Sequence, residues 1–157
     1  MRRHVEPVRV EFVDTDAGGR IHHTAALRWA ERAEHALLRA CGWPELTSFP
    51  RRRISVEFLA PLRFGDEVEV EIAASRVGRT SVTWAWRMVR AGATCVVGET
   101  TCVYVGADGR PAPVPVALRE VLGVQPDGAG TTDQAGRGPG GSETSENCTT
   151  RSDSSGA

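Results

Sequence analysis

Residues 10–41 of the chain, VEFVDTDAGGRIHHTAALRWAERAEHALLRAC, decide the expected fold. At the start of this stretch, Val8, Val10 and Phe12 alternate with polar residues, which predicts a β-strand. Two aspartates, a glycine pair and two histidines follow. Over residues 24–41 apolar residues recur at helical spacing, with Thr24 as the expected N-cap. The pattern predicts a strand, a polar loop and one long helix, whose first backbone N–H groups face that loop.

Four further strands are expected after the helix. Apolar and polar residues alternate in four segments, residues 54–58, 67–72, 81–88 and 94–105. Turn signals at residues 78–79 and 91–92 make the last three strands antiparallel neighbours. A short helix is expected over residues 116–122. Because one amphipathic helix cannot bury its own apolar face, the sheet must wrap around it, and the sequence predicts an α+β domain.

Two apolar strand faces are not expected both to find cover within one chain, because a single helix covers only one face of a small sheet. Trp84 and Trp86 share one strand face, and Val68, Val70 and Ile72 share another. If these faces cannot all be covered within one chain, a second copy must cover the remainder. The sequence therefore predicts a homo-oligomer, at least a dimer.

Composition limits the classes of function. A chain of 157 residues with 40% hydrophobic residues is long enough for one domain with its own core. The net charge of −1 gives no electrostatic reason to expect nucleic acid as a partner. The sequence has no run of about 18 apolar residues, so no membrane span is expected. Lys is absent, which excludes a Schiff-base lysine, and the GxSxG and HExxH motifs are missing.

The cysteines and the end of the chain carry little chemistry. The four cysteines form no CxxC pair, so neither a metal site nor a disulfide is expected, and reduced thiols fit a cytoplasmic protein. Residues 124–157 contain no Leu, Ile, Phe, Trp or Tyr and are dense in Gly, Ser and Thr. Such a segment cannot bury enough apolar surface to offset its ordering entropy. The sequence predicts a domain over residues 1–123 and a disordered tail over residues 124–157.

The polar loop resembles a known family. The segment Asp14-Thr15-Asp16-Ala17-Gly18-Gly19, with His23 downstream, is similar to the opening of the 4-hydroxybenzoyl-CoA thioesterase family, especially its bacterial Tol-Pal-linked acyl-CoA thioesterase branch. The similarity continues through residues 56–66 and 78–81. The resemblance implies a hotdog fold, in which an antiparallel sheet wraps around one long helix. It also implies hydrolysis of an acyl-CoA or acyl-carrier-protein thioester by a homodimer or homotetramer, without a metal or an organic cofactor.

The resemblance further implies roles for the loop residues. Asp16 matches the family's catalytic aspartate, which attacks the thioester carbonyl or activates the attacking water. His23 is expected to polarise the substrate or hold that water. Its backbone N–H, together with Gly18 and Gly19, is expected to form the oxyanion site. Asp14 is expected to support the loop by hydrogen bonding to backbone or to an arginine. For all of these residues, a turn and a helix cap without catalysis is the alternative.

A second segment of the resemblance concerns coenzyme A. Arg79, Thr80 and Ser81 match the segment that contacts pantetheine and nucleotide, and a guanidinium suits phosphate because its planar fork donates paired hydrogen bonds. A hairpin turn with a solvated arginine is the alternative. On the helix, Glu31 is expected to form a salt bridge with Arg28, three residues earlier on the same face.

Three functions are consistent with the residues. A thioesterase is favoured, because the Asp-Ala-Gly-Gly loop fits hydrolysis best. A hotdog dehydratase would instead use a histidine and a carboxylate on a hydroxyacyl thioester. A non-catalytic acyl-binding or dimerisation module would have no turnover. The sequence leaves open the acyl group, the choice between coenzyme A and a carrier protein, and the choice between nucleophile and general base for Asp16.

Overall fold

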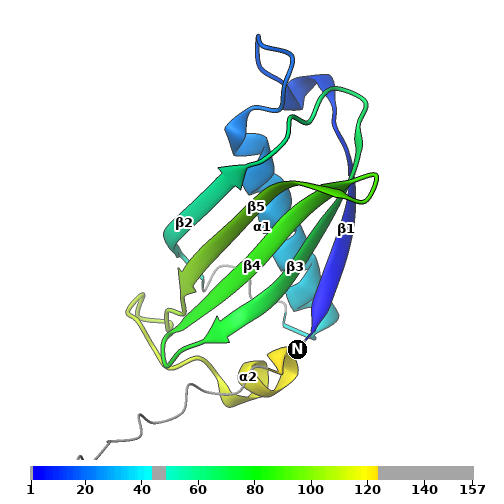
Figure 1. The fold of residues 1–157 in the computed structure, drawn as a ribbon. Coiled ribbons are helices and arrows are strands. Elements are labelled where there is room, and N and C mark those ends of the chain that lie inside the picture. Colours follow the sequence, from blue (N-terminus) through cyan, green and yellow to red (C-terminus); the bar gives the residue numbers. More distant parts are fainter. Residues whose placement is uncertain (1, 44–48, 124–157) are drawn as a thin grey trace, which may run out of the picture.

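The computed structural model describes residues 2–43 and 49–123, and Figure 1 shows one sheet with a long helix lying across it. In chain order the elements are β1 (Arg3–Arg9), the 3-10 turn η1 (Phe12–Asp14), α1 (His23–Ala40), β2 (Arg51–Phe58), β3 (Glu67–Val77), β4 (Ser81–Arg90), β5 (Ala93–Val103) and α2 (Val116–Leu122). The predicted tail, residues 124–157, lies outside the described residues.

The sheet is antiparallel throughout, with the strand order β1-β3-β4-β5-β2. The two predicted hairpins join β3 to β4 and β4 to β5. β1 and β2, which flank α1 in the sequence, form the two edges of the sheet. This arrangement confirms the expected α+β hotdog fold and the short helix predicted over residues 116–122.

Helix α1 packs on the sheet through a face that combines alanines with Trp29, Glu34 and two leucines. Ala26, Ala30 and Ala33 are buried along its middle, and Leu37 and Leu38 are buried near its end. Burying a leucine side chain contributes about 1.5–3 kcal/mol, so Leu37 and Leu38 anchor the end of the helix. Neither α-helix in the described residues is long and apolar enough to cross a membrane.

The prediction that these two apolar strand faces could not both be covered within one chain is wrong. Ile72 lies opposite Trp86, and Val70 lies opposite Met88, so both sets of residues belong to the same face of the sheet. They join the core with α1, and even Trp86 is only 4% exposed. Alternation within a strand does not determine the register between strands, and the error arose there.

Two details before the helix also differ from the prediction. β1 ends at Arg9, and Phe12 lies in η1 with 80% of its surface exposed, because the chain turns there toward the helix. The N-cap of α1 is His22 rather than Thr24. The His22 Nδ1 atom accepts the Thr24 N–H at 3.3 Å, so an imidazole nitrogen replaces the expected hydroxyl.

Candidate active site

The chain between η1 and α1 closes as a small turn before the helix begins. Thr15 and Ile21 form an isolated antiparallel bridge. Within it, the Asp16 N–H donates to the Arg20 carbonyl at 2.8 Å, and the Gly19 N–H donates to the Asp16 carbonyl at 3.0 Å. Gly19 has a φ of 68°, a conformation that favours glycine. The turn thereby fixes the position of Asp16 next to the helix.

The Asp16 carboxylate is exposed and is held through one of its oxygens. Oδ1 accepts the Gly18 N–H at 2.8 Å and the Arg20 N–H at a longer 3.5 Å. A Cβ at position 18 would come within 3.1 Å of Oδ1, so glycine permits the close approach of backbone and carboxylate. Oδ2 forms no hydrogen bond with the residues that the structure describes. One oxygen is therefore positioned and the other is available to a reactant.

Asp14 has a different environment and is only 8% exposed. Its Oδ1 accepts from Arg28 Nη2 at 3.0 Å, and its Oδ2 accepts the Glu11 N–H at 3.1 Å. Its carbonyl accepts the His22 N–H at 2.7 Å. These bonds tie η1 to the first turn of α1. Hydrogen bonds to backbone and to an arginine are the ones the sequence predicted for Asp14.

Among the residues that the structure describes, one backbone N–H at the start of α1 has no hydrogen-bond partner. The Thr24 N–H donates to His22 Nδ1, and the Ala25 N–H donates to the His22 carbonyl at 2.8 Å. The His23 N–H makes no hydrogen bond within residues 2–43 and 49–123. It lies at the helix end where the macrodipole favours negative charge. The His23 ring lies against the His22 ring, with centroids 4.2 Å apart.

Asp16 and His23 line one open cavity of about 360 Å³. The chain from the end of β2 onwards supplies its apolar wall, formed by Phe58, Ala60, Pro61 and Leu62. The Ile21 N–H donates to the Leu62 carbonyl at 2.9 Å, which fixes this wall against the turn. The structure thus brings together two predicted residues, a carboxylate and the start of a helix, beside an apolar surface.

Arg79, Thr80 and Ser81 lie at the opposite end of the sheet from Asp16, as Figure 1 shows for the β3–β4 turn and the loop before α1. The Asp16 turn follows β1, whose last residue pairs with Glu67 at the start of β3. The segment with Arg79 follows the other end of β3. A strand of 11 residues extends roughly 33 Å, so one chain does not bring the predicted coenzyme A contact to Asp16.

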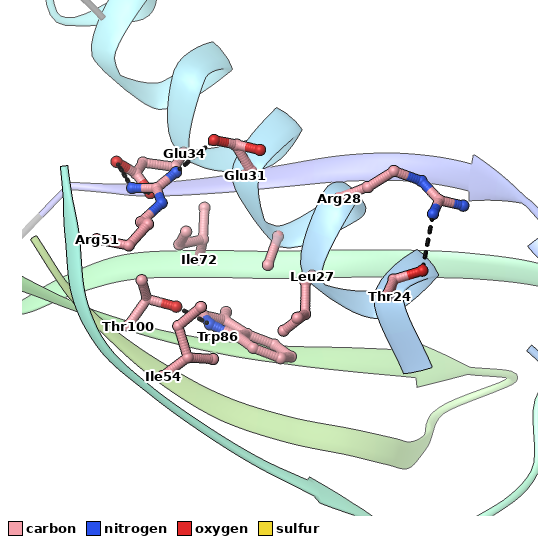
Figure 2. A pocket seen from close by; sticks show the side chains of 11 residues that line it. Thr24, Leu27, Arg28, Glu31, Glu34, Arg51, Ile54, Ile72, Trp86 and Thr100 are labelled. Atoms are coloured by element: carbon pink, nitrogen blue, oxygen red, sulfur yellow. Dashed lines mark hydrogen bonds and ion pairs between the residues drawn. The ribbon is translucent and has the colours of Figure 1, made fainter. Parts of the chain in front are cut away.

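A second cavity, of about 190 Å³, lies between α1 and the sheet (Figure 2). Leu27 of α1, Ile54 of β2, Ile72 of β3 and Trp86 of β4 form its apolar walls. Thr24 lies at the end nearest the start of the helix. Thr24 follows His23 directly in the chain, but the two cavities share no lining residue.

An ion pair lies at the other end of the second cavity. Arg51 Nη1 is 2.7 Å from Glu34 Oε2, and Arg51 Nη2 donates to Glu31 Oε1 at 3.0 Å. The predicted salt bridge between Glu31 and Arg28 is therefore wrong. Arg28 instead donates to Asp14, because η1 brings that carboxylate to the first turn of the helix.

Burial is the largest influence on the pKa values of Glu34 and Cys102 near this ion pair. Glu34 is 2% exposed; desolvation raises its pKa, and the hydrogen bond and charge of Arg51 act against that rise. Burial raises the pKa of the Cys102 thiol to about 11, so the thiol is protonated at neutral pH. The Thr100 hydroxyl accepts the Trp86 Nε1–H at 3.1 Å.

Trp86 lies against Gly98 of the neighbouring strand β5. The two residues are opposite each other in the register, and a Cβ at Gly98 would overlap the indole ring. The absence of a side chain at position 98 therefore allows the indole to lie flat at the base of the second cavity.

Several of these residues were not identified from the sequence. Glu34 had a detectable signal, because Ala30, Glu34 and Leu38 follow one another at four-residue spacing and all are buried. An acidic residue in such an apolar row is unusual. Its partner Arg51 and the hydroxyl of Thr100 come from distant strands, so they leave no local signal. Within the described part of the chain, no three His, Cys, Asp or Glu side chains are grouped to hold a metal ion.

Comparison with known proteins relates these features to a family. The profile of the Thioesterase superfamily matches residues 18–97, about half of the chain, and starts just after Asp16. The acyl-CoA thioester hydrolase YbgC of Escherichia coli O6:H1 is 34% identical over 108 residues, which cover 65% of this chain and 80% of that protein. The 1,4-dihydroxy-2-naphthoyl-CoA hydrolase of Synechococcus sp. (strain RCC307) is 29% identical over 126 residues, which cover 72% and 95%.

A solved structure shares both sequence and fold with the chain. The thioesterase of Thermus thermophilus, in complex with coenzyme A and zinc, matches with a TM-score of 0.71 at 30% identity. The match covers 76% of this chain and 91% of that protein. The profile match runs from the loop before α1 into β5 and so includes the helix and most of the sheet. This chain belongs to the thioesterase superfamily and has its hotdog fold.

Proposed function

We propose that this chain hydrolyses acyl-CoA thioesters to a free acid and coenzyme A. Its superfamily and the two hydrolases of CoA thioesters described above support this reaction. The observation that carries the proposal is the cavity lined by both Asp16 and the start of α1, where the His23 N–H has no partner within the described residues. Thioester hydrolysis needs a base or nucleophile and a donor for the developing oxyanion, and these two groups supply them.

Asp16 has two chemically complete roles in this proposal. As a general base, the carboxylate takes a proton from water while the water oxygen bonds to the thioester carbon. Collapse of the tetrahedral intermediate then breaks the C–S bond, and the departing thiolate takes up a proton. As a nucleophile, Asp16 displaces the thiolate to form a mixed anhydride, which water hydrolyses to restore the carboxylate. In both roles Oδ2 reacts, because Oδ1 is held by Gly18.

The start of α1 is proposed to stabilise the oxyanion. The His23 N–H and the positive end of the helix dipole favour negative charge on the carbonyl oxygen of the substrate. The glycines Gly18 and Gly19 keep the turn beside this position free of side chains. The imidazole of His23 is proposed to hold the attacking water or to polarise the carbonyl.

A second copy of the chain is proposed to complete the active site. Because residues 79–81 lie at the far end of the sheet, their proposed contact with coenzyme A reaches Asp16 from another copy. β2 is an edge strand that carries exposed Ile54 and Phe58, and two such edges can pair as one sheet. A homodimer is the minimum assembly and a tetramer is favoured. Sedimentation equilibrium at micromolar concentration tests this, and a monomer that still hydrolyses acyl-CoA would overturn it.

The finer assignments made from the sequence stay predictions. These are the place of the chain in the Tol-Pal-linked branch of the 4-hydroxybenzoyl-CoA thioesterase family, its use of coenzyme A rather than a carrier protein, and its cytoplasmic location. Parallel assays with matched acyl-CoA and acyl-carrier-protein substrates would decide between coenzyme A and a carrier protein. Cell fractionation would decide the cellular location.

The central test is a hydrolysis screen over a panel of acyl-CoA thioesters, with the released thiol as the readout. Wild type is compared with Asp16→Asn and with the matched control Asp108→Asn. Asp108 is also exposed, and its Oδ1 also accepts a backbone N–H two residues later, from Arg110 at 3.0 Å. We expect turnover to fall only in Asp16→Asn. Equal turnover in wild type and both variants would reject Asp16 as the reacting group.

A further inference from the structure

We propose that Arg119, on helix α2, is a positioning residue for coenzyme A, because it holds the turn at residues 78–81 in the conformation that meets a phosphate group. The inference rests on the proposed function, in which this turn contacts the coenzyme A of a thioester cleaved at Asp16 of another copy. Arg119 lies outside residues 18–97, the part of the chain that the thioesterase profile matches.

The guanidinium of Arg119 donates to backbone carbonyls from two segments of the chain. Its Nη2 atom donates to the carbonyls of Gly78 and Arg79, the second at 3.0 Å, and its Nη1 atom donates to that of Val77 at 3.4 Å. Its Nε atom donates to the Val114 carbonyl at 3.2 Å. Among the residues that the structure describes, no carboxylate pairs with it. The planar fork of this arginine therefore joins the turn after β3 to the chain just before α2.

Helix α2 gives this side chain a fixed starting point. Leu118 and Leu122, on either side of Arg119 in the helix, are 1% and 0% exposed and belong to the core. The Arg119 N–H donates to the Pro115 carbonyl at 3.1 Å. Figure 1 shows α2 at the same end of the sheet as the turn between β3 and β4. Because the two leucines anchor α2, the helix should stay in place when only the guanidinium is removed.

The bonded carbonyls determine where the N–H groups of the turn point. In a trans peptide, a carbonyl and the N–H of the next residue point in opposite directions. Since the carbonyls of Gly78 and Arg79 face Arg119, the N–H groups of Arg79 and Thr80 face away from it. Neither N–H makes a hydrogen bond within residues 2–43 and 49–123. Two successive free N–H groups are the kind of backbone donor pair that binds anions.

One peptide of the turn depends on Arg119 alone. The carbonyls of Arg79 and Thr80 have further donors, the N–H groups of Val114 and Tyr104, both at 2.8 Å. The Gly78 carbonyl has no other donor in the described part of the chain. A glycine backbone rotates more freely than that of any other residue, so without Arg119 the peptide between residues 78 and 79 can turn over. That rotation would redirect the Arg79 N–H and the start of its side chain, which is exposed.

The first test measures binding, so that it does not depend on catalysis. Calorimetry with free coenzyme A gives the dissociation constants of the full wild-type chain and of Arg119→Met, and circular dichroism checks the fold. We expect Arg119→Met to bind coenzyme A about tenfold more weakly, because the turn must then be ordered on binding. The matched control is Arg32→Met. Arg32 of α1 also donates to a backbone carbonyl, that of Pro7 at 3.1 Å, and its variant should keep the wild-type affinity.

The variant Arg119→Lys separates the fork from the charge. Lysine keeps the positive charge, but its single ammonium cannot donate to both segments in the geometry of a guanidinium. We therefore expect Arg119→Lys to lose about as much affinity for coenzyme A as Arg119→Met. Wild-type affinity in the lysine variant would overturn the inference, since charge alone would then account for the effect.

A double-mutant cycle tests whether Arg119 acts through the turn. Arg79→Met removes the proposed phosphate contact, and Arg79→Met/Arg119→Met removes both side chains. If Arg119 positions Arg79, the loss of affinity in the double variant should be smaller than the product of the two single losses. A loss equal to that product, or no loss in Arg79→Met alone, would contradict the inference.

Kinetics distinguish positioning from general structural damage. The constant kcat/KM is measured for an acyl-CoA and for the same acyl group on N-acetylcysteamine, a thiol without phosphate. The ratio of the two constants should fall about tenfold in Arg119→Met, because only the first substrate uses the turn. An unchanged ratio would show that the variant damages the whole molecule and would overturn the inference.

The remaining outcomes separate this inference from the proposed function. If coenzyme A does not bind to wild type, or binds equally well to Arg119→Met, the inference is wrong, even when acyl-CoA is hydrolysed. If the affinities change as expected but no thioester is hydrolysed, the inference holds and the proposed function fails. Should Arg119→Met not fold, Arg119→Lys takes its place in the cycle and in the kinetics, with the same expected losses.

Discussion

Two turns of this molecule share one backbone design but differ in where they place a carboxylate. Residues 16–20 have the sequence DAGGR, and residues 106–110 have the sequence GADGR. In each, the first residue's N–H donates to the fifth residue's carbonyl, at 2.8 and 2.9 Å. In each, the N–H of the fourth residue, a glycine with φ of 68° or 73°, donates to the first residue's carbonyl. Each turn is enclosed by its own isolated bridge, Thr15–Ile21 for the first and Val105–Pro111 for the second.

The difference lies in the first and third positions. Asp16 is the first residue of its turn, and its carboxylate faces a cavity shared with the start of α1. Asp108 is the third residue of its turn, which follows β5, and its carboxylate accepts the Arg110 backbone N–H. The turn itself is therefore a general structural unit. We infer that its position before a helix, with the carboxylate first, makes it a candidate site.

Exchanging the two positions would test this directly. The variant Asp16→Gly/Gly18→Asp gives the first turn the sequence of the second, so it should fold, because that sequence already forms this turn in the same molecule. Thioester turnover should fall about a hundredfold or more, equivalent to about 2.7 kcal/mol in the barrier, because the carboxylate leaves the helix start. The thiol-release assay and a melting curve measure both effects. Full activity in the exchanged variant would mean that any carboxylate in the turn suffices.

The Asp16 turn also has a buried support, Asp14, directly before it. Asp14→Ala should lower the free energy of unfolding by about 2 kcal/mol, because the Glu11 N–H and the Arg28 guanidinium lose their acceptor. Activity should fall with it, since the turn is no longer tied to α1. Urea denaturation measures the loss. Asp14→Asn, which keeps one acceptor oxygen, should recover part of the stability; an unchanged unfolding energy in Asp14→Ala would show that Asp14 does not support the turn.

Gly19 and Gly109, the positive-φ glycines of the two turns, form a matched pair for a smaller effect. A Cβ added at Gly19 or at Gly109 would have no other atom within 4 Å, so alanine at either position meets only backbone strain. Gly19→Ala and Gly109→Ala should each cost about 1 kcal/mol in stability. Only Gly19→Ala should also lower turnover, because its turn carries the proposed active site. Equal turnover in the two variants would separate the conformation of residue 19 from catalysis.

The smallest effect is expected from removing residues 124–157. Both turns, the core and α2 lie before this segment, and its composition offers little apolar surface to bury. The melting temperature and the turnover of the truncated chain should equal those of the full chain within error. Hydrogen exchange on the full chain gives an independent check, and protected amides in residues 124–157 would contradict the expectation.

The order of elements could be predicted from the sequence because it depends on local patterns. Helical spacing and turn signals are patterns formed by residues close together in the chain. The structure has the expected helix before residue 41 and the expected turns at residues 78–79 and 91–92. The register between β3 and β4 depends on contacts between strands. That is why the sequence analysis placed Val70 and Trp86 on two faces that could not both be covered, whereas they share one covered face.

The part of the candidate site that lies in one continuous segment of the chain could be predicted from the sequence. Asp16 and His23 were chosen because the loop that contains them resembles the opening of a known family; the pattern of a carboxylate, glycines and a helix start alone is equally that of a plain turn and cap. The second cavity was not found, because Glu34, Arg51 and Thr100 come from three separate elements and meet only when α1 lies on the sheet. The sequence of the second turn, residues 106–110, carried no resemblance to guide its interpretation, although its backbone is the same.

The contact between Trp86 and Gly98 links the size of the second cavity to a residue on another strand. Any side chain at position 98 would push the indole away from β5 and into the space between sheet and helix. The two positions can therefore change only together: a smaller residue at 86 must precede or accompany a larger one at 98. Related chains with a side chain at position 98 should carry a smaller residue at position 86, and such paired exchanges offer a route to redesigning the depth of this cavity.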